Sequence, residues 1–315
     1  MKRLRKILII SLSAILAFVL IIHPIFAVVL YEAIFSVRYE PSSKYSFSLD
    51  HFDSLEVERV ELLGEGERLV GFKYSNPTVE ETNGLVVFCH GLGGGGHTPY
   101  LQLVDAFTDL GYLVFTYDAT GNGESDGKDT NGLPQGPIDL ERAISTALSD
   151  PEYSDLPLYL VGHSWGAYSV GIALGNHPEV KGAVMFAGFD SSSDMMEVRA
   201  ADYAGKFLAS LASPVVDFYE RVKFGDCSTL TVTDSIAAAD ARVMIVHSKD
   251  DKTVPPSVGY EKYYESFEGD TRVTFLLYED RGHNRLYYSK GREIDADLMQ
   301  KIDEMFQKAE KEAVM

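Results

Sequence analysis

The stretch around Ser164 constrains the fold of this chain more than any other feature. An apolar, β-prone run, Leu158–Val161, leads into Gly-His-Ser-Trp-Gly at 162–166, and a helix-compatible run follows at 167–174. A strand, a sharp turn and a helix are the context in which Gly-x-Ser-x-Gly presents a nucleophilic serine. The turn lifts the hydroxyl above the end of a sheet, and the two glycines are needed because larger residues would collide with the adjoining strand and helix. The helix also directs the positive end of its dipole at the site, so we predict that Ser164 is a nucleophile.

A serine hydroxyl is a weak nucleophile until a histidine takes its proton and a carboxylate orients that histidine. Of the eight histidines, His283 follows the last predicted strand and precedes the last predicted helix, where its ring can overhang Ser164. Asp251 lies in the loop after the preceding strand, three residues ahead of a Val-Pro pair, and is the preferred acid. Its neighbour Asp250, and Asp190 at the end of the strand that follows the nucleophile helix, are alternatives.

The oxyanion of a tetrahedral intermediate needs backbone N–H donors. One donor is expected from Trp165, directly after the nucleophile. The second is expected from Leu92, in the glycine-rich loop 90–96 that follows the apolar run Leu85–Cys89. Glycines allow the backbone to approach the substrate oxygen closely at such a loop.

The same loop raises a different interpretation, a dinucleotide site. Gly91, Gly93 and Gly96 match G-x-G-x-x-G between a predicted strand and a predicted helix, and Asp118 ends the next strand. However, the Thr-Pro pair at 98–99 indicates that the helix starts after the glycines, whereas the third glycine of the fingerprint lies within the helix. A nucleotide site would also leave the serine, aspartate and histidine contexts unexplained. We therefore predict that no cofactor and no metal is needed.

The rest of the chain alternates between strand and helix patterns. Strands are predicted at 55–63, 69–74, 85–89, 112–117, 158–161, 182–187, 242–246 and 272–278. Helices are predicted at 100–110, 138–148, 167–174, 257–267 and 294–311. The first two strands are joined by Gly-Glu-Gly-Glu, which favours a hairpin. Strands that alternate with helices predict an α/β fold with a mostly parallel sheet, covered on both faces.

Residues 190–240 interrupt this alternation. Apolar side chains at helical spacings predict two or three short amphipathic helices there: Met195, Met196, Tyr203, Phe207, Leu208, Leu211, Val215, Val216, Phe218, Tyr219 and Val222. An insertion after the strand that follows the nucleophile is a natural place for a cap over the site. Packing of the same residues on the body is the alternative, and one face must pack in either case.

Residues 7–31 are almost wholly apolar and follow four basic residues. A helix of this length spans about 37 Å, more than the bilayer's hydrocarbon core, so it can cross with tilt. The basic residues place the N-terminus in the cytoplasm and the body outside. A cleaved signal peptide is the alternative, but the nearest cleavage candidate, Ile-Phe-Ala at 25–27, has a large first residue. The pattern favours an uncleaved anchor in the cell membrane.

Charge and cysteine content limit the possible partners. The 315-residue chain has a formal net charge of −19 despite the basic residues at its start. An acidic body argues against nucleic acid, whose affinity comes from neutralised phosphates, and against anionic lipid head groups. Two cysteines, Cys89 in an apolar strand and the distant Cys227, form no disulfide framework.

Five motifs together resemble the α/β-hydrolase superfamily, in particular its branch of monoglyceride-lipase-like esterases and serine aminopeptidases. They are His90-Gly91-x-Gly93, Asp118-x-x-Gly121-x-Gly123-x-Ser125, Gly162-x-Ser164-x-Gly166, Asp251-x-x-Val254-Pro255 and Gly282-His283. The resemblance covers roughly residues 55–310 and implies an eight-stranded sheet, a cap and a Ser-His-Asp triad. The family often has Arg two residues after the first Asp of the second motif. Here Ala119-Thr120 stand in that stretch, so a substrate contact by such an Arg is not expected.

The sequence thus predicts a membrane-anchored serine hydrolase that cleaves esters of uncharged acyl groups through an acyl-enzyme. We expect an anchor at 1–35, a linker at 36–54 and a hydrolase domain at 55–312 with the cap at about 190–240. Ser164, His283 and Asp251 are the expected triad, with Leu92 and Trp165 at the oxyanion. Two alternatives remain: a peptidase or thioesterase with the same triad, and a non-catalytic binding protein on this scaffold.

Overall fold

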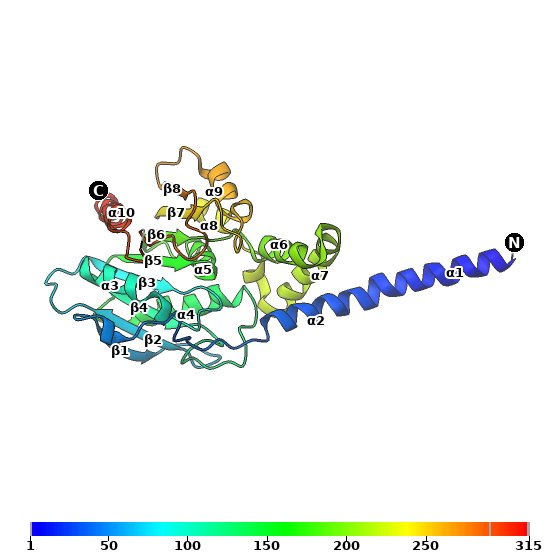
Figure 1. Ribbon diagram of the computed structural model, residues 1–315, viewed down its shortest axis with the longest axis horizontal. Helices are drawn as coiled ribbons and strands as arrows, with labels where there is room; N and C mark the ends of the chain where they lie inside the picture. The colour runs from blue at the N-terminus through cyan, green and yellow to red at the C-terminus, as the bar shows by residue number, and fades with distance from the viewer. Residues whose placement is uncertain (1, 290, 314–315) are drawn as a thin grey trace.

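The predicted strands join one eight-stranded sheet in the computed structural model, which describes residues 2–289 and 291–313 (Figure 1). In spatial order the strands are β1 (Glu56–Glu61), β2 (Val70–Ser75), β4 (Tyr112–Asp118), β3 (Gly84–Cys89), β5 (Leu158–His163), β6 (Val180–Phe186), β7 (Arg242–Ser248) and β8 (Val273–Tyr278). The β1–β2 and β2–β4 pairs are antiparallel, and every pair from β4 to β8 is parallel. The prediction of a mostly parallel α/β sheet is confirmed.

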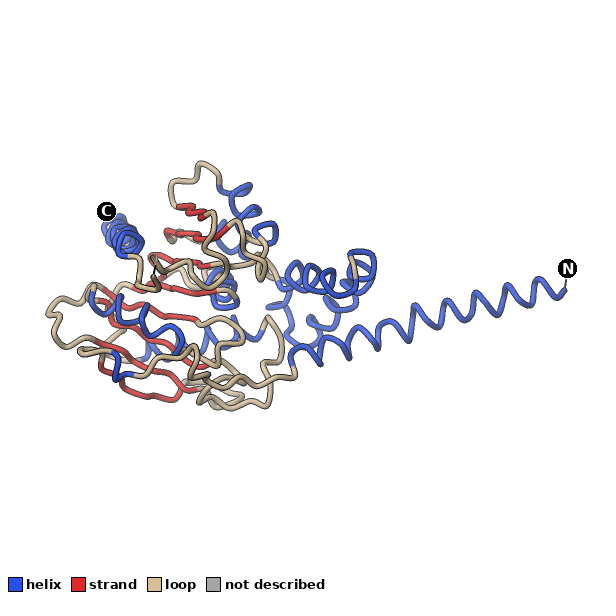
Figure 2. Tube along the Cα trace, viewed as in Figure 1, coloured by secondary structure: helices blue, strands red, loops and turns tan. Residues whose placement is uncertain are grey.

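Helices cover both faces of this sheet (Figure 2). One face carries α3 (Leu101–Asp109) and α10 (Ala296–Ala313), and the other carries α4 (Gln135–Ser149), α5 (Trp165–Ala173), α8 (Val232–Ala238) and α9 (Tyr260–Phe267). Central strands are therefore apolar on both sides. In β3, Leu85 and Val87 join the core under α4 and α5, whereas Val86 and Phe88 join the core under α3 and α10. Short 3₁₀ turns lie at Leu49–His51, Thr98–Tyr100, Gly225–Thr229 and Pro256–Val258.

The segment between β6 and β7 divides into two parts. The helices α6 (Ser192–Ala204) and α7 (Lys206–Phe224) pack on each other and are joined at Gly205. The third helix, α8, packs on α5 and belongs to the layer that covers the sheet. The range predicted for the cap, 190–240, thus contains one helix of the body, and we call α6 and α7 the cap hairpin.

The N-terminal segment forms one long helical rod, which leaves the body beside the cap hairpin (Figure 1). It consists of α1 (Lys2–Ala17), a π-helical turn at Phe18–Ile22 and α2 (His23–Phe35). The π turn directly precedes Pro24, whose missing N–H and bulky ring disturb the regular helical bonding of the turn before it. By length and composition the rod is apolar enough to cross a membrane, a property that signal sequences share.

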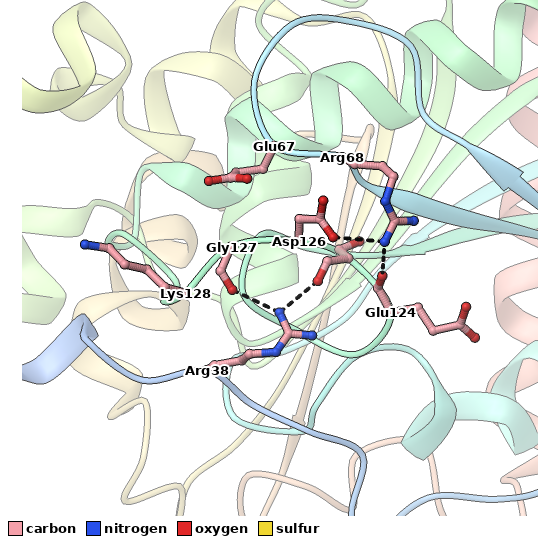
Figure 3. Close-up of a pocket in the computed structure, with 8 residues that line it drawn as sticks. Arg38, Glu67, Arg68, Glu124, Asp126, Gly127 and Lys128 are labelled. Carbon is pink, nitrogen blue, oxygen red and sulfur yellow. Dashed lines mark hydrogen bonds and ion pairs between the residues drawn. The ribbon is translucent and has the colours of Figure 1, made fainter.

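Residues 36–54 were predicted as a linker, and they lie bound to the body. The Arg38 guanidinium donates hydrogen bonds to the carbonyl oxygens of Ser125 and Gly127 at 2.8 and 2.9 Å (Figure 3). It also donates to the Gly123 carbonyl. From the opposite side Arg68 binds Asp126 in the same loop. These bonds hold the chain that leaves α2 against the loop after β4, so the direction of the N-terminal rod is set by the body.

Candidate active site

Ser164 sits at the turn between β5 and α5 with a strained backbone. Its φ of 57° and ψ of −116° are unusual for a residue with a side chain. The Ser164 N–H donates to the Phe186 carbonyl at the end of β6, at 2.7 Å, which holds the turn against the sheet. Only 9% of the Ser164 surface is exposed, and α5 begins at the next residue. The turn therefore presents the hydroxyl at the carboxyl end of the sheet, as the sequence predicted.

The two glycines of the motif leave no room for side chains. A Cβ at Gly162 would collide with the Gly166 carbonyl, and a Cβ at Gly166 would collide with the Cys89 carbonyl. Because the obstacles are backbone atoms, no side-chain rearrangement can relieve either clash. The collisions inferred from the sequence are therefore with the first turn of α5 and with the end of β3.

The structure brings Ser164, His283 and Asp251 into one chain of hydrogen bonds. Ser164 Oγ lies 2.9 Å from His283 Nε2, and His283 Nδ1 lies 2.8 Å from Asp251 Oδ2. The carboxylate accepts only, so the neutral ring carries its proton on Nδ1 and accepts the serine proton at Nε2. This is the arrangement in which a base activates a hydroxyl and an acid fixes the tautomer of that base.

Asp251 is held as an anion. Its Oδ1 accepts the N–H groups of Thr253 and Val254 at 2.8 and 2.9 Å, and the side chain is buried. Burial alone would raise its pKa. The hydrogen bond and charge of His283, the Val254 N–H and the nearby His247 outweigh burial, so the pKa of Asp251 lies below its usual range.

The alternative acids have other partners. Asp250 accepts hydrogen bonds from the Ser248 hydroxyl and the Gly282 N–H, so it braces the loop that carries His283 without touching the imidazole. Asp190 accepts from the N–H and hydroxyl of Thr233 at the start of α8. Neither carboxylate is bonded to His283. Geometry therefore favours Asp251 as the orienting acid.

His163, inside the serine motif, links two loops of the site. Its Nε2 lies 2.9 Å from the His283 carbonyl, and its Nδ1 lies 2.9 Å from the Tyr100 hydroxyl. A carbonyl only accepts, so Nε2 carries the proton and Nδ1 accepts from Tyr100, whose oxygen in turn accepts the Gly91 N–H at 3.0 Å. Burial, together with the charge of His283, lowers the pKa of His163 to about 3, so the ring stays neutral. The chain of bonds runs from the glycine loop to the backbone of His283.

The two expected oxyanion donors belong to residues near Ser164 in the folded chain. Leu92 and Trp165 both line the cleft that contains the serine. In the described part of the chain no group accepts from the Leu92 N–H, and Trp165 is the first residue of α5, where helical N–H groups have no intrahelical partner. The Trp165 indole itself points into the core and donates to the Leu133 carbonyl at 2.7 Å. Donation to an oxyanion by these two backbone groups stays a prediction.

The glycine loop is filled by its own protein neighbours. The buried Asp118 carboxylate accepts the backbone N–H and Nδ1 of His97, and the N–H of Glu124. A Cβ at Gly96 would collide with this carboxylate, and α3 starts only at Leu101. Asp118 thus joins two loops and does not face a ribose, which agrees with rejection of the dinucleotide interpretation.

A large cleft opens over Ser164 and His283. Its volume is about 1590 Å³, beyond the roughly 300–1,000 Å³ of common ligand pockets. Its walls are mainly apolar and come from the cap hairpin, the N-terminal helix and the loops around the serine. The folded chain brings four cations from several segments to this cleft: Lys44, Arg199, Arg285 and Arg292.

Comparison with known proteins identifies the fold. Residues 80–223 match the family described as serine aminopeptidase, S33. The chain also resembles the Pyrococcus furiosus esterase Pf2001, with a TM-score of 0.63 and 16% identity over 86% of this chain and 97% of that one. The chain has the α/β-hydrolase fold. It is also similar in structure to acetyl xylan esterase 1 from Thermoanaerobacterium, with a TM-score of 0.58 and 16% identity over 87% and 96% of the two chains.

Two curated proteins are similar to this chain in sequence. YqkD of Bacillus subtilis, described as uncharacterized, is 27% identical over 220 residues, which are 67% of this chain and 68% of YqkD. Caffeoylshikimate esterase of Arabidopsis thaliana is 31% identical over 147 residues. The match spans 43% of this chain and 42% of the plant protein, less than half of either.

Not every residue that shapes the site was assigned a role from the sequence. His163 was considered only as part of the serine motif at 162–166, and Tyr100 only as the first residue of the predicted helix 100–110. The sequence did contain a signal for His163, because the residue before the nucleophile must point to the side of the turn opposite the serine. No cluster of three His, Cys, Asp or Glu side chains suited to a metal occurs among residues 2–289 and 291–313. The expectation that no metal or cofactor is needed stays a prediction.

Proposed function

We propose that this α/β-hydrolase is a membrane-anchored serine esterase that cleaves carboxylic esters of uncharged acyl groups. One observation carries the proposal: Ser164, His283 and Asp251 form a continuous hydrogen-bonded chain at the inner end of an apolar cleft. The esterases among the similar proteins support the reaction class. The family match to serine aminopeptidases makes amide cleavage the competing activity.

In the proposed first step, Ser164 Oγ attacks the carbonyl carbon of the ester while His283 Nε2 accepts its proton. The Leu92 and Trp165 N–H groups stabilise the oxyanion that forms on the carbonyl oxygen. His283 then gives the proton to the oxygen of the leaving alcohol as the acyl–oxygen bond breaks. Asp251 keeps the imidazole in the productive tautomer and stabilises its positive charge during these transfers.

In the second step, a water molecule attacks the acyl-Ser164 ester. His283 accepts a proton from this water and later returns one to Ser164 Oγ, which releases the carboxylic acid and restores the enzyme. His163 donates its Nε2–H to the His283 carbonyl and so keeps this backbone in place. Because the ring stays neutral at the pH at which an esterase works, its Nδ1 can accept from Tyr100 at the same time. No step of this cycle calls for a metal or a redox group.

The apolar walls support the choice of acyl group. Met195 and Met196 of α6 and Val216 of α7 line the cleft, and methionine side chains adapt to chains of different shape. Each methylene that moves from water into such a cleft gains about 0.8 kcal/mol. The four cations belong to the exposed or half-exposed rim, and Arg285 already donates to the Asp280 carbonyl. We therefore place the uncharged acyl chain along the apolar walls.

The N-terminal rod is proposed as an uncleaved anchor, with residues 1–35 as the anchor segment, 36–54 as the connection and 55–312 as the hydrolase domain. The basic start of the chain favours a cytoplasmic N-terminus and an extracytoplasmic domain in the cell membrane. α2 packs on α7 and belongs to the single helical run Arg3–Phe35, so an uncleaved chain would hold the rod directly to the body. Full-length protein in carbonate-washed membranes is the expected result, and a soluble form beginning near Val28 would refute it.

The activity is tested with a fluorophosphonate probe and two substrate series. The probe should label wild-type protein at Ser164 and leave Ser164→Ala unlabelled. p-Nitrophenyl esters from acetate to palmitate should be cleaved with kcat/KM rising severalfold per added carbon until the cleft is filled. Faster cleavage of amino-acid p-nitroanilides would assign a peptidase, and faster cleavage of acyl thioesters a thioesterase. Absence of labelling would favour a binding protein.

A further inference from the structure

We propose that the N-terminal helix is itself one wall of the acyl-binding cleft, and that the cleft opens into the membrane beside this helix. The ligand that fits is the acyl chain of a neutral membrane lipid ester, drawn sideways from the bilayer until its ester carbonyl reaches Ser164. The proposal rests on the esterase activity argued above and names the source and path of the substrate. It gives the anchor a role in substrate binding in addition to attachment.

The first observation is that one face of the rod lines the cleft. Five of its apolar residues recur every four positions: Phe18, Ile22, Phe26, Leu30 and Ile34. Residues four apart lie on the same face of a helix, so these side chains form a continuous apolar stripe. The same cleft contains Ser164 and His283, so the stripe leads from the proposed nucleophile along the rod.

The second observation is that the rod is fixed to the cap hairpin through polar contacts. The Tyr31 hydroxyl donates to buried Glu220 of α7 at 2.8 Å, and Glu220 also accepts from Ser192 of α6. The next residue, Glu32, accepts from the Tyr219 hydroxyl and from Lys223, both at 2.7 Å. Polar partners at these positions of an apolar helix set its rotation, and this rotation turns the stripe toward the cleft.

The third observation concerns length. Ala27, Tyr31 and Phe35 are buried against the body, whereas the apolar side chains described between residues 4 and 26 are exposed. At 1.5 Å per residue this exposed part measures about 35 Å, enough for a hydrocarbon core of about 30 Å. The bilayer therefore covers Phe18, Ile22 and Phe26, which also line the outer end of the cleft. A cleft lined by membrane-embedded residues opens to lipid.

The fourth observation is an exposed apolar surface at the end of the cap hairpin. Tyr203, Phe207 and Leu208 are 82%, 79% and 53% exposed, next to the Gly205 turn. This end of the hairpin points along the rod, on the side to which the rod leaves the body (Figures 1 and 2). Large apolar residues that protrude beside a membrane helix enter the interface readily. They would place the second wall of the opening at the membrane surface.

These observations together select a lipid acyl chain as the occupant. A polar ester from solution would have to pass apolar walls that offer it few partners. A second protein segment could fill an apolar groove, but it would not deliver an ester carbonyl to Ser164 at the inner end. An acyl chain that leaves the bilayer exchanges one apolar surrounding for another, so its transfer costs little, and its ester end reaches the triad.

The direct test uses full-length protein in neutral lipid vesicles and a long-chain alkyl fluorophosphonate with a diazirine near the end of its chain. After Ser164 is labelled, light should link the far end of the chain to α2 or the π turn, in the peptide that contains Phe18–Leu30. Links confined to the hydrolase body or the cap would overturn the acyl path while the esterase assignment stands. Failure of Ser164 to react would overturn the esterase assignment, and this proposal with it.

A matched pair of variants tests the same wall by kinetics. Leu30 lines the cleft at 47% exposure, whereas Val29, 60% exposed on the same helix, is not part of its lining. Leu30→Trp should lower the ratio of kcat/KM for p-nitrophenyl palmitate to kcat/KM for p-nitrophenyl acetate about tenfold, because a blocked acyl path excludes long chains more than short ones. Val29→Trp should leave this ratio unchanged. An equal palmitate-to-acetate ratio in the two variants would refute the wall.

Discussion

The catalytic end of the sheet and the cap–anchor region differ in which side chains are buried and in how their polar groups are paired. Around Ser164 the polar side chains are buried and paired, and backbone groups hold most of them, as with the two N–H groups on Asp251. Around α6, α7 and α2 large apolar side chains are exposed, and a few polar bonds such as Tyr31–Glu220 hold the helices together. This pairing holds the atoms of the first region at the fixed distances that proton transfer needs. The second offers apolar surface, which suits a ligand that varies in length.

If this contrast is correct, changes at the catalytic end should alter the rate for every substrate, whereas changes at the cap and anchor should alter the preference among substrates. Asp251→Asn should have the largest effect. The amide would lose the charge that stabilises the imidazolium and would favour the wrong tautomer of His283, so kcat should fall by a factor on the order of 10⁴ for acetate and palmitate esters alike.

The two other carboxylates supply the controls for this experiment. Asp250→Asn and Asp190→Asn should cost far less, because neither side chain is bonded to His283. Steady-state rates with the short and long ester measure all three variants. Near-normal turnover by Asp251→Asn, with a large loss in either control, would move the orienting role to that neighbour.

The contrast also explains what could be predicted from the sequence. The strands, the serine turn and the order of Ser164, Asp251 and His283 follow local patterns, since each depends on neighbours within a few residues. The Arg38 contacts, the Tyr100–His163 chain and the docking of α2 on α7 join residues far apart, and no local pattern encodes those pairings.

A partial signal for the anchor's second role was present in the sequence. The four-residue spacing of Phe18, Ile22, Phe26, Leu30 and Ile34 and the polar pair Tyr31-Glu32 distinguish one face of the rod. In a uniformly apolar segment such spacing carries little information by itself. The partners on α7 give it meaning, and those partners are known only once the chain is folded.

The next largest effect is expected from acid. His163 is neutral down to a pKa of about 3 in the folded protein, against 6.5 for a free imidazole. Between these values the unfolded chain binds more protons, so the stability contribution of His163 is present above pH 6.5 and is lost as the pH falls. By linkage this loss is on the order of 2 kcal/mol between pH 7 and pH 5.

Urea unfolding at several pH values measures this loss, and a His163→Phe variant isolates it. The variant is less stable overall, but its stability should decline less between pH 7 and pH 5. Asp139, whose pKa burial raises to about 6, contributes in the opposite direction in both proteins and cancels in the comparison. Parallel pH curves for the two proteins would contradict a neutral buried His163. Burial also raises the pKa of Glu220. Protonation of this cap residue therefore stabilises the folded protein as the pH falls, which is opposite to the effect of His163.

A smaller loss is expected at Tyr100. Tyr100→Phe removes the oxygen that accepts the Gly91 N–H and the proton that His163 accepts. The glycine loop and His283 would lose their link, so kcat should fall about tenfold with similar factors for short and long esters. Tyr287→Phe is the control, since its ring packs on His163 without joining the chain. If only the KM for palmitate changed in Tyr100→Phe, the residue would belong to the acyl path and not to the catalytic end.

The smallest effect should come from the cap–anchor contact. It should change the preference between long and short esters and not the rate for every ester. Tyr219→Phe removes one hydrogen bond to Glu32, a half-exposed contact worth up to about 1 kcal/mol. The rod would then leave its docked position more often, which lowers kcat/KM for palmitate in vesicles by at most about fivefold and leaves acetate hydrolysis unchanged. Tyr264→Phe, which alters an exposed hydroxyl on α9 away from the cleft lining, should change neither rate. An equal loss for both esters in Tyr219→Phe would mean that the rod supports the triad itself, and the division between a rigid catalytic end and an adaptable substrate path would fail.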